Sequence, residues 1–425
     1  MSKLIINGGN KLEGEVNISG AKNAILPILA ASLISKKEIV IENVPNLADV
    51  HIMLELLEDI GSASHFDIEK GILTIYEKDE INHFIENAEW CEKIRTSSLF
   101  LGPILAINGE VKIPKPGGCK IGARLIDMHL HFLNKMSAEV IDDECFVCLK
   151  ADKRLQGIDA NFYKTSVGAT QNIMIAASLA HEITTINNAS LEPEVVDLGN
   201  FLISLGVKIE GLGTSTIRIY GENRDNIFQR KPYKIIYDRM EVGTYAILAM
   251  ATKSKLFLKN ANYDHLKYFF ETLKLANGRI EVKNDGILVS IDESEKIFAK
   301  SIVTAPYPYF PTDLQQIYTT LMCVASGSSV IEEKIFNGRF LFIKELSKMG
   351  AKIYQQDENK IIVEGVEKLH SAEIYAHDLR GSMALLIAGV IANGRTMLHN
   401  AGYLNRGYEN FEKKFKAIGA KIDFT

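Results

Sequence analysis

One loop of the sequence places a cysteine among glycines and cations. Cys119 lies within Lys115-Pro-Gly-Gly-Cys-Lys-Ile-Gly-Ala-Arg124. Glycines allow a backbone to approach a ligand closely, and nearby cations favour the reactive thiolate over the thiol. A structural cysteine is more typical of an apolar run, such as the one around Cys323. We therefore interpret Cys119 as a residue with a chemical role.

A second candidate ends a proline-rich segment. The stretch Thr304–Asp313 reads Thr-Ala-Pro-Tyr-Pro-Tyr-Phe-Pro-Thr-Asp and leads into an expected helix. Two interpretations of Asp313 stay open, namely an aspartate that caps this helix and a rigidly held general base. His129 is interpreted as a helix-surface histidine, and the remaining histidines show no ligand spacing. No metal and no cofactor are expected.

Charged and hydroxyl residues recur where the most apolar helices are expected to begin. Helix N-termini attract anions, so a cation at this position opposes the usual preference for acids. A single such cation could be a salt-bridged surface residue. Five basic positions at equivalent places instead favour a cleft between two domains that binds phosphates and carboxylates. The charged and hydroxyl residues at the six helix starts are Lys22, Arg95, Lys164 with Ser166, Asp238-Arg239 with Glu241, Asp313, and Asp378 with Arg380.

The elements that carry these residues form a repeat. An amphipathic helix, a small residue and a short strand recur six times, at intervals of 76, 69, 71, 73 and 69 residues. A small residue after a helix indicates its C-terminal end, because glycine tolerates the left-handed conformation. The small residues are Gly61, Ser137, Gly206, Asn277, Gly350 and Gly419. A second, wholly apolar helix per repeat is expected to be buried. These helices begin near Ala21, Ile94, Thr165, Arg239, Thr312 and Leu379.

Six units of this length predict two domains of three repeats each. A polar stretch at 223–237 is a possible boundary, and the strand expected at 3–6 could join the C-terminal half. We therefore expect residues 1–21 with 230–425 to form one discontinuous domain, and residues 22–229 to form the other.

Charge and composition exclude several classes of function. The 425 residues include 48 Lys and Arg against 53 Asp and Glu, a net charge of −5. This balance gives no reason to expect nucleic acid or a membrane as a partner. Apolar stretches such as 24–34 are about half the roughly 20 residues that span a bilayer. The N-terminus lacks the features of a signal peptide, and five cysteines indicate a reducing compartment. A cytoplasmic protein without an obligate protein partner is expected.

Taken together, the motifs resemble the enolpyruvyl transferases, from Ile6-Asn-Gly-Gly to Gly419-Ala-Lys-Ile. The matching stretches are Ser19-Gly-Ala-Lys-Asn-Ala, Arg95-Thr-Ser-Ser-Leu-Phe-Leu-Gly-Pro, Pro116-Gly-Gly-Cys-Lys-Ile-Gly-Ala-Arg124, Ser166-Val-Gly-Ala-Thr, Asp238-Arg-Met-Glu-Val-Gly-Thr, Phe310-Pro-Thr-Asp313, Arg339-Phe, Asp378-Leu-Arg380 and Arg406-Gly-Tyr-Glu409. The resemblance implies an α/β fold, a two-domain inside-out α/β barrel with six β-α-β-α-β-β repeats. The Gly-Gly-Cys loop points to the branch that acts on a UDP-amino sugar, because the shikimate-phosphate branch lacks it.

The resemblance also implies the reaction and the role of each site residue. Phosphoenolpyruvate would donate its enolpyruvyl group to the 3′-hydroxyl of UDP-N-acetylglucosamine and release phosphate, at the start of peptidoglycan synthesis. Cys119 would act as general acid and as the target of fosfomycin, and Asp313 as general base. Lys22, Arg124 and Arg406, supported by Arg95, would hold phosphoenolpyruvate. The UDP-sugar would contact Asn23, Arg124, Asp127, Lys164, Ser166, Val167, Gly168 and Ile335, and Arg339 and Arg380 would act on domain closure.

Three positions depart from the family pattern. Leu125 replaces the usual proline after Arg124, Tyr309 a usual glycine, and Gly338 the usual asparagine before Arg339. None of these changes removes a catalytic group. They keep open a paralogue that acts on another UDP-hexosamine. A catalytically silent sensor of sugar nucleotides is the alternative from another functional class, although a sensor would need neither the acid nor the base.

Overall fold

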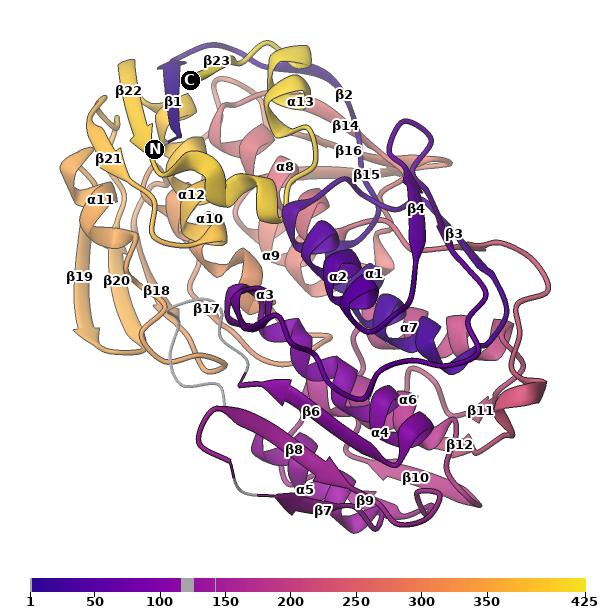
Figure 1. The fold of residues 1–425 in the computed structure, drawn as a ribbon. Coiled ribbons are helices and arrows are strands. Elements are labelled where there is room, and N and C mark those ends of the chain that lie inside the picture. The colour runs from indigo at the N-terminus through magenta and orange to yellow at the C-terminus, as the bar shows by residue number, and fades with distance from the viewer. Residues whose placement is uncertain (1, 116–125, 142) are drawn as a thin grey trace. The chain divides into compact units, whose positions relative to one another are not determined.

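The computed structural model describes residues 2–115, 126–141 and 143–425. The chain forms two compact units (Figure 1). Unit 1 contains the described residues 2–19 and 237–425, and unit 2 contains the described residues between 20 and 236. Within the described ranges, no helix has the length and apolar character needed to cross a bilayer. Cys119, Arg124 and Leu125, three positions of the sequence predictions, lie outside the described residues.

Unit 1 contains three four-stranded sheets built to one pattern, a parallel strand pair extended by antiparallel strands. The first has the order β15 (Arg279–Lys283), β16 (Gly286–Ser290), β14 (Lys255–Lys259), β2 (Glu13–Asn17). The second has the order β17 (Ile302–Val303), β18 (Ser328–Glu332), β20 (Lys360–Glu364), β19 (Lys352–Asp357). The third has the order β21 (Glu373–Tyr375), β22 (Gly394–His399), β1 (Lys3–Gly8), β23 (Lys421–Phe424).

Three apolar helices pack against one another in unit 1, namely α8 (Arg239–Ala251), α10 (Thr312–Met322) and α12 (Leu379–Ile391). Every residue of α8 is buried. A helix that is buried on all sides is usually apolar on all sides, as most of α12 is, whereas α10 also buries the amides of Gln315 and Gln316. The other helices of the unit are η4 (Asp264–Leu266), α9 (Lys267–Leu275), α11 (Ile343–Lys348), η5 (Ala401–Arg406) and α13 (Phe411–Ala417).

Unit 2 follows the same plan. One sheet has the order β13 (Tyr233–Lys234), β3 (Ile39–Glu42), β5 (Ile72–Ile75), β4 (Ser64–Asp67). Another has the order β11 (Lys208–Glu210), β12 (Thr216–Tyr220), β10 (Ile183–Asn187), β9 (Asp159–Asn161). The third has β6 (Glu110–Pro114), β8 (Phe146–Lys150) and β7 (Glu139–Ile141), and a parallel bridge from Phe84 to Lys112 occupies the place of a fourth strand.

The buried helices of unit 2 are α1 (Lys22–Ala31), α4 (Leu101–Asn108) and α6 (Val167–Ala177), with η2 (Arg95–Phe100) leading directly into α4. The remaining helices are η1 (Ser32–Ile34), α2 (Ala48–Asp59), α3 (Ala88–Lys93), α5 (Asp127–Lys135), α7 (Pro193–Ser204) and η3 (Arg224–Asn226). Each predicted apolar helix therefore begins within two residues of its expected start, counting η2 and α4 as one element.

The predicted helix ends are also confirmed. All six small residues adopt positive φ angles, from 78° at Ser137 to 105° at Gly206. In this left-handed region glycine and asparagine are the least strained, which explains the residue types at five of these ends, Ser137 being the exception.

The N-terminal segment belongs to unit 1. Strand β1 lies between β22 and β23, where Leu4 pairs with both Leu398 and Phe424 (Figure 1). The borders of the units fall at 19/20 and 236/237. The domain limits expected from the sequence, at 21/22 and 229/230, stay predictions.

Candidate active site

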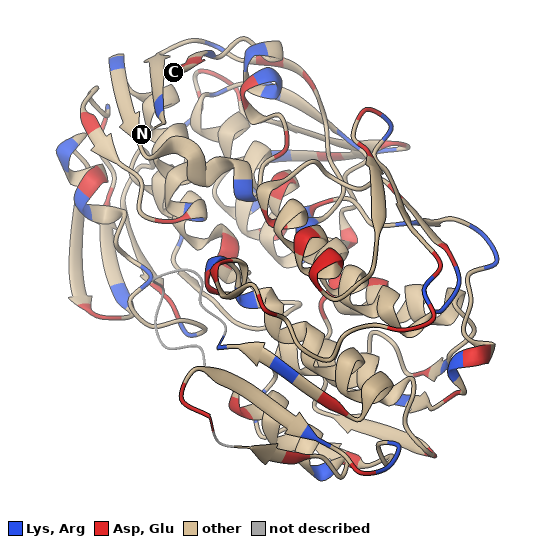
Figure 2. Cartoon of the chain, in the orientation of Figure 1, with Lys and Arg blue, Asp and Glu red and all other residues tan. Residues whose placement is uncertain are grey.

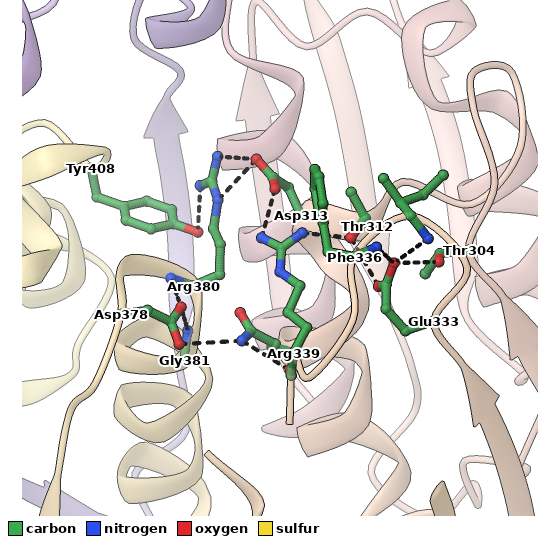
Figure 3. Close-up of polar contacts among 12 residues, drawn as sticks. Thr304, Thr312, Asp313, Glu333, Phe336, Arg339, Asp378, Arg380, Gly381 and Tyr408 are labelled. Carbon is green, nitrogen blue, oxygen red and sulfur yellow. Dashed lines mark hydrogen bonds and ion pairs between the residues drawn. The ribbon is translucent and has the colours of Figure 1, made fainter. Parts of the chain in front are cut away.

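The carboxylate of Asp313 is held by two arginines in unit 1 (Figure 3). Arg339 Nη2 donates to Asp313 Oδ1 at 2.7 Å, and Arg380 Nη2 donates to Asp313 Oδ2 at 2.9 Å. The interpretation of Asp313 as a helix cap is wrong, because Pro311 occupies the N-cap position of α10. The side chain of Asp313 instead turns toward guanidinium groups that come from two other segments.

The two arginines are buried, whereas the carboxylate they hold is partly exposed. The side chains of Arg339 and Arg380 are 3% and 4% exposed, whereas that of Asp313 is 27% exposed. Two adjacent cations favour the ionised carboxylate. Arg380 approaches Asp313 Oδ2 with both Nη2 and Nε, the latter at 3.3 Å, while Arg339 approaches Oδ1, so the orientation of the carboxylate is fixed from two sides. The arrangement fits a fixed carboxylate that accepts a proton from a bound hydroxyl.

Arg380 is anchored by a chain of hydrogen bonds. Its Nη1 donates to the hydroxyl of Tyr408 at 3.1 Å, and that hydroxyl lies 3.0 Å from Thr244 Oγ1. Thr244 donates its own proton to the backbone carbonyl of Met240 at 2.8 Å, so Tyr408 donates to Thr244. Burial acts to lower the pKa of Arg380, but Tyr408 and Asp313 raise that pKa overall. Arg380 is therefore a permanent cation of defined position.

In unit 2, Lys22 forms a largely buried ion pair at the start of α1. Its Nζ lies 3.2 Å from Asp49 Oδ2, with side-chain exposures of 12% and 4%. Asn23 follows Lys22 on the same helix. Asp49 comes from the first turn of α2 and was missed from the sequence, because an acid in a first helical turn is common.

A second set of unit 2 surrounds the start of α6. Tyr163 donates to Asp127 Oδ2, a hydrogen bond that lowers the pKa of Asp127, and the charge of Lys164 lowers that pKa further. Ser166 caps α6 by accepting from the N–H of Ala169 at 3.3 Å. Asp127 and Lys164 therefore lie near each other, and three further predicted residues, Ser166, Val167 and Gly168, follow Lys164 at the start of α6. Tyr163, which is 62% exposed, was not predicted from the sequence as a site residue.

His129 is buried, so its interpretation as a helix-surface histidine is wrong. Its Nδ1 lies 2.8 Å from Asn172 Nδ2, which can only donate, so the ring proton resides on Nε2. Asn172 also donates to the carbonyl of Ser98 at 3.2 Å and accepts from the N–H of Gly102 at 2.8 Å. A single amide of α6 thus ties together α5, which begins at Asp127, and the η2–α4 segment, which begins at Arg95.

The neutral state of His129 has a consequence for stability. Burial, followed by the charge of Arg95, lowers the pKa of His129 from 6.5 to about 4. Unfolding therefore takes up a proton between these two values, so His129 stabilises the fold fully above pH 6.5 and progressively less as pH falls toward 4. We expect unaltered protein to lose about 3 kcal/mol more unfolding free energy between pH 7 and pH 4 than His129→Gln loses. Urea unfolding across this pH range measures the difference, and parallel curves for the two proteins would contradict it.

Two further predicted residues belong to unit 1. Arg406 ends η5 in unit 1, and Ile335 follows β18. Cys323 is fully buried, and burial raises its pKa to about 12, as expected of a structural cysteine. Acidic and basic residues are interspersed along the ribbons of both units (Figure 2). In the part of the chain that the structure describes, no cluster of three or more His, Cys, Asp or Glu side chains could hold a metal ion.

Comparison with known proteins agrees with the resemblance seen in the sequence. The family model for EPSP synthase (3-phosphoshikimate 1-carboxyvinyltransferase) matches residues 6–415. The UDP-N-acetylglucosamine 1-carboxyvinyltransferase 1 of Carboxydothermus hydrogenoformans is 42% identical over 422 residues, which cover 99% of this chain and 98% of that protein. The UDP-N-acetylglucosamine 1-carboxyvinyltransferase of Thermotoga petrophila is 43% identical over 426 residues, covering 100% and 99%.

Solved structures agree in fold. The enolpyruvyl transferase NikO from Streptomyces tendae superposes with a TM-score of 0.88 at 23% identity, covering 100% of this chain and 99% of that chain. EPSP synthase from Acinetobacter baumannii gives 0.76 at 17% identity, covering 100% of both chains. The mixed α/β fold with several sheets is thus that of enolpyruvyl transferases. The chain therefore belongs to the EPSP synthase family and, within it, to the UDP-N-acetylglucosamine 1-carboxyvinyltransferases.

Proposed function

We propose that this chain transfers the enolpyruvyl group of phosphoenolpyruvate to the 3′-hydroxyl of UDP-N-acetylglucosamine, the first committed step of peptidoglycan synthesis. The observation that carries the proposal is the partly exposed Asp313 carboxylate between two buried arginines. It occurs in a chain that matches UDP-N-acetylglucosamine 1-carboxyvinyltransferases over its full length. A binding protein without catalysis would have no need of such a base.

The proposed chemistry is addition followed by elimination. Asp313 takes the proton of the 3′-hydroxyl while its oxygen forms a bond to C2 of phosphoenolpyruvate. Cys119 donates a proton to C3, which gives a tetrahedral ketal. The bond from C2 to the phosphate oxygen then breaks, the Cys119 thiolate takes a proton back from C3 to restore the double bond, and phosphate leaves with the proton that Asp313 had accepted. The several cations of the site would stabilise the anionic groups throughout.

The other predicted residues take the roles implied by the family. Lys22, Arg124 and Arg406, with Arg95, hold phosphate and carboxylate. The UDP-sugar contacts are Asn23, Arg124, Asp127, Lys164, Ser166, Val167, Gly168 and Ile335. Arg339 and Arg380 contribute to domain closure, and their contacts with Asp313 support a further role in orienting the base.

We also propose the finer architecture and setting. Each unit would be a domain of three β-α-β-α-β-β repeats in an inside-out α/β barrel, with limits at 1–21 plus 230–425 and at 22–229. The sheets of one pattern and the buried central helices support this. The enzyme would act in the cytoplasm, where fosfomycin would alkylate Cys119.

Phosphate release tests the function directly. We expect release from phosphoenolpyruvate that depends on UDP-N-acetylglucosamine and is absent without a sugar. UDP-N-acetylgalactosamine and UDP-glucose serve as comparison acceptors. Release only with one of these would assign the chain to a paralogue with another acceptor, whereas binding without release would favour the sensor.

A further inference from the structure

A buried carboxylate, that of Glu333, accepts a hydrogen bond from the neighbour of the proposed base, Thr312. Glu333 is 1% exposed and follows β18 directly. Its Oε1 accepts from Thr304 Oγ1 and the N–H of Ile335, each at 2.8 Å, and from the N–H of Phe336 at 3.1 Å. Its Oε2 accepts from Thr312 Oγ1 at 2.8 Å. All four donors are neutral groups.

These contacts exceed what the local turn requires. A buried carboxylate is costly unless its acceptor sites are occupied, and a polar or apolar side chain could replace it if only the turn mattered. The three hydrogen bonds to Oε1 stabilise the turn at 333–336 and the start of the proline-rich loop at Thr304. The hydrogen bond from Thr312 to Oε2 stabilises neither of these segments, because Thr312 is the first residue of α10, next to Asp313.

The single proton of Thr312 fixes the direction of the next contact. A hydroxyl has one proton to donate, and Thr312 gives it to Glu333. Thr312 Oγ1 can then only accept from Arg339 Nη1, which donates to it. The other terminal nitrogen of Arg339 donates to Asp313 (Figure 3). A continuous path of directed hydrogen bonds therefore joins Glu333 to Asp313.

We propose that Glu333 is a positioning residue for Asp313, acting through Thr312 and Arg339. The same carboxylate accepts from the N–H of Ile335, a predicted UDP-sugar contact. Glu333 would therefore fix the position of the base and of a residue that contacts the acceptor sugar. The inference rests on the proposed function, because it requires Asp313 to act as the base. Nothing in the sequence signals it, since Glu333 reads as the polar end of a strand.

Four variants of the full chain test the path. Glu333→Gln keeps an acceptor for the turn but removes the charge and the acceptor that faces Thr312. Thr312→Val removes the hydroxyl while keeping a similar shape and the three bonds to Oε1, and Thr312→Ser keeps the hydroxyl. Glu345→Gln is the matched control, because Glu345 is also buried in unit 1 and bonds instead to Lys348 and the N–H of Tyr375.

We expect Glu333→Gln and Thr312→Val each to lower kcat by about 10- to 100-fold, because misplacement of about 1 Å costs this much. KM for phosphoenolpyruvate should stay within about twofold, because the path does not include its proposed ligands. A looser Arg339 stabilises ionised Asp313 less, so the acid limb of the kcat–pH profile should move up by roughly one unit. The double variant should be no worse than either single one. Thr312→Ser and Glu345→Gln should behave like unaltered protein.

Two results would overturn the positioning role. One is an unshifted acid limb in both Glu333→Gln and Thr312→Val, and the other is a loss in Glu345→Gln equal to that in Glu333→Gln. If Glu333→Gln does not fold, the contrast between Thr312→Val and Thr312→Ser decides alone. Absence of phosphate release from the unaltered protein would instead refute the proposed function, so the two failures are distinguishable.

Discussion

Replacing Asp313 by alanine is expected to lower kcat for phosphate release by roughly 10²- to 10⁴-fold, the usual contribution of a general base. Binding of UDP-N-acetylglucosamine should weaken by only about tenfold, because the Asp313 carboxylate is partly exposed and a hydrogen bond to it is expected at the lower end of the range for charged groups, about 1.5 kcal/mol. The two effects separate because Asp313 is needed for proton removal, whereas several other residues hold the sugar nucleotide. Steady-state kinetics and calorimetric titration measure them independently.

Two further variants make this result specific. Asp313→Asn keeps the shape and one acceptor for the arginines but cannot take a proton, so it should be nearly as inactive. Asp292→Ala removes an exposed aspartate of unit 1 that also pairs with an arginine, Arg279, and should be fully active. Activity of Asp313→Ala close to that of unaltered protein would remove this residue from the mechanism.

Replacing Cys119 by aspartate is expected to abolish inactivation by fosfomycin while part of the turnover remains. A carboxylic acid can donate a proton to C3, as the thiol is proposed to do, but it lacks the sulfur nucleophile that attacks the drug. The measurement is residual activity against time of exposure to fosfomycin, with product formation followed in parallel.

An exposed cysteine elsewhere supplies the control for this experiment. Cys145 of unit 2 is exposed and lies outside every proposed site, so Cys145→Ser should stay as sensitive as unaltered protein. Continued inactivation of Cys119→Asp would show that the drug attacks another group.

The repeat could be predicted because its signals are local. A small residue ends each amphipathic helix, and the positive φ at Gly61 or Asn277 depends only on the adjacent turn. The buried helices could be predicted because they are mostly apolar around their whole circumference, and such helices are typically found in a protein core. Periodic local features of this kind determine elements and their order well.

The side-chain contacts of the site join segments that are distant in the sequence, so most of them could not be predicted from local patterns. The carboxylate of Asp313 meets arginines that are 26 and 67 residues away in sequence, and no local pattern specifies such a meeting. The same limit explains the wrong interpretations of Asp313 as a cap and of His129 as a surface residue. Asn172 offered a usable signal, because a polar amide inside an apolar helix requires partners.

The placement of β1 between β22 and β23 has a consequence for synthesis on the ribosome. Strand β1 is synthesised before unit 2 and cannot pair until β22 and β23 have been made, whereas the segments of unit 2 are complete once residue 236 has emerged. At roughly 5–20 residues per second, translation of the remaining 189 residues takes about 10 to 40 s. Unit 2 can fold during this interval, while the apolar Leu4 and Ile6 stay without their sheet and are open to capture by a nascent-chain chaperone. Loss of residues 421–425, which include β23, would therefore damage unit 1 and leave unit 2 intact.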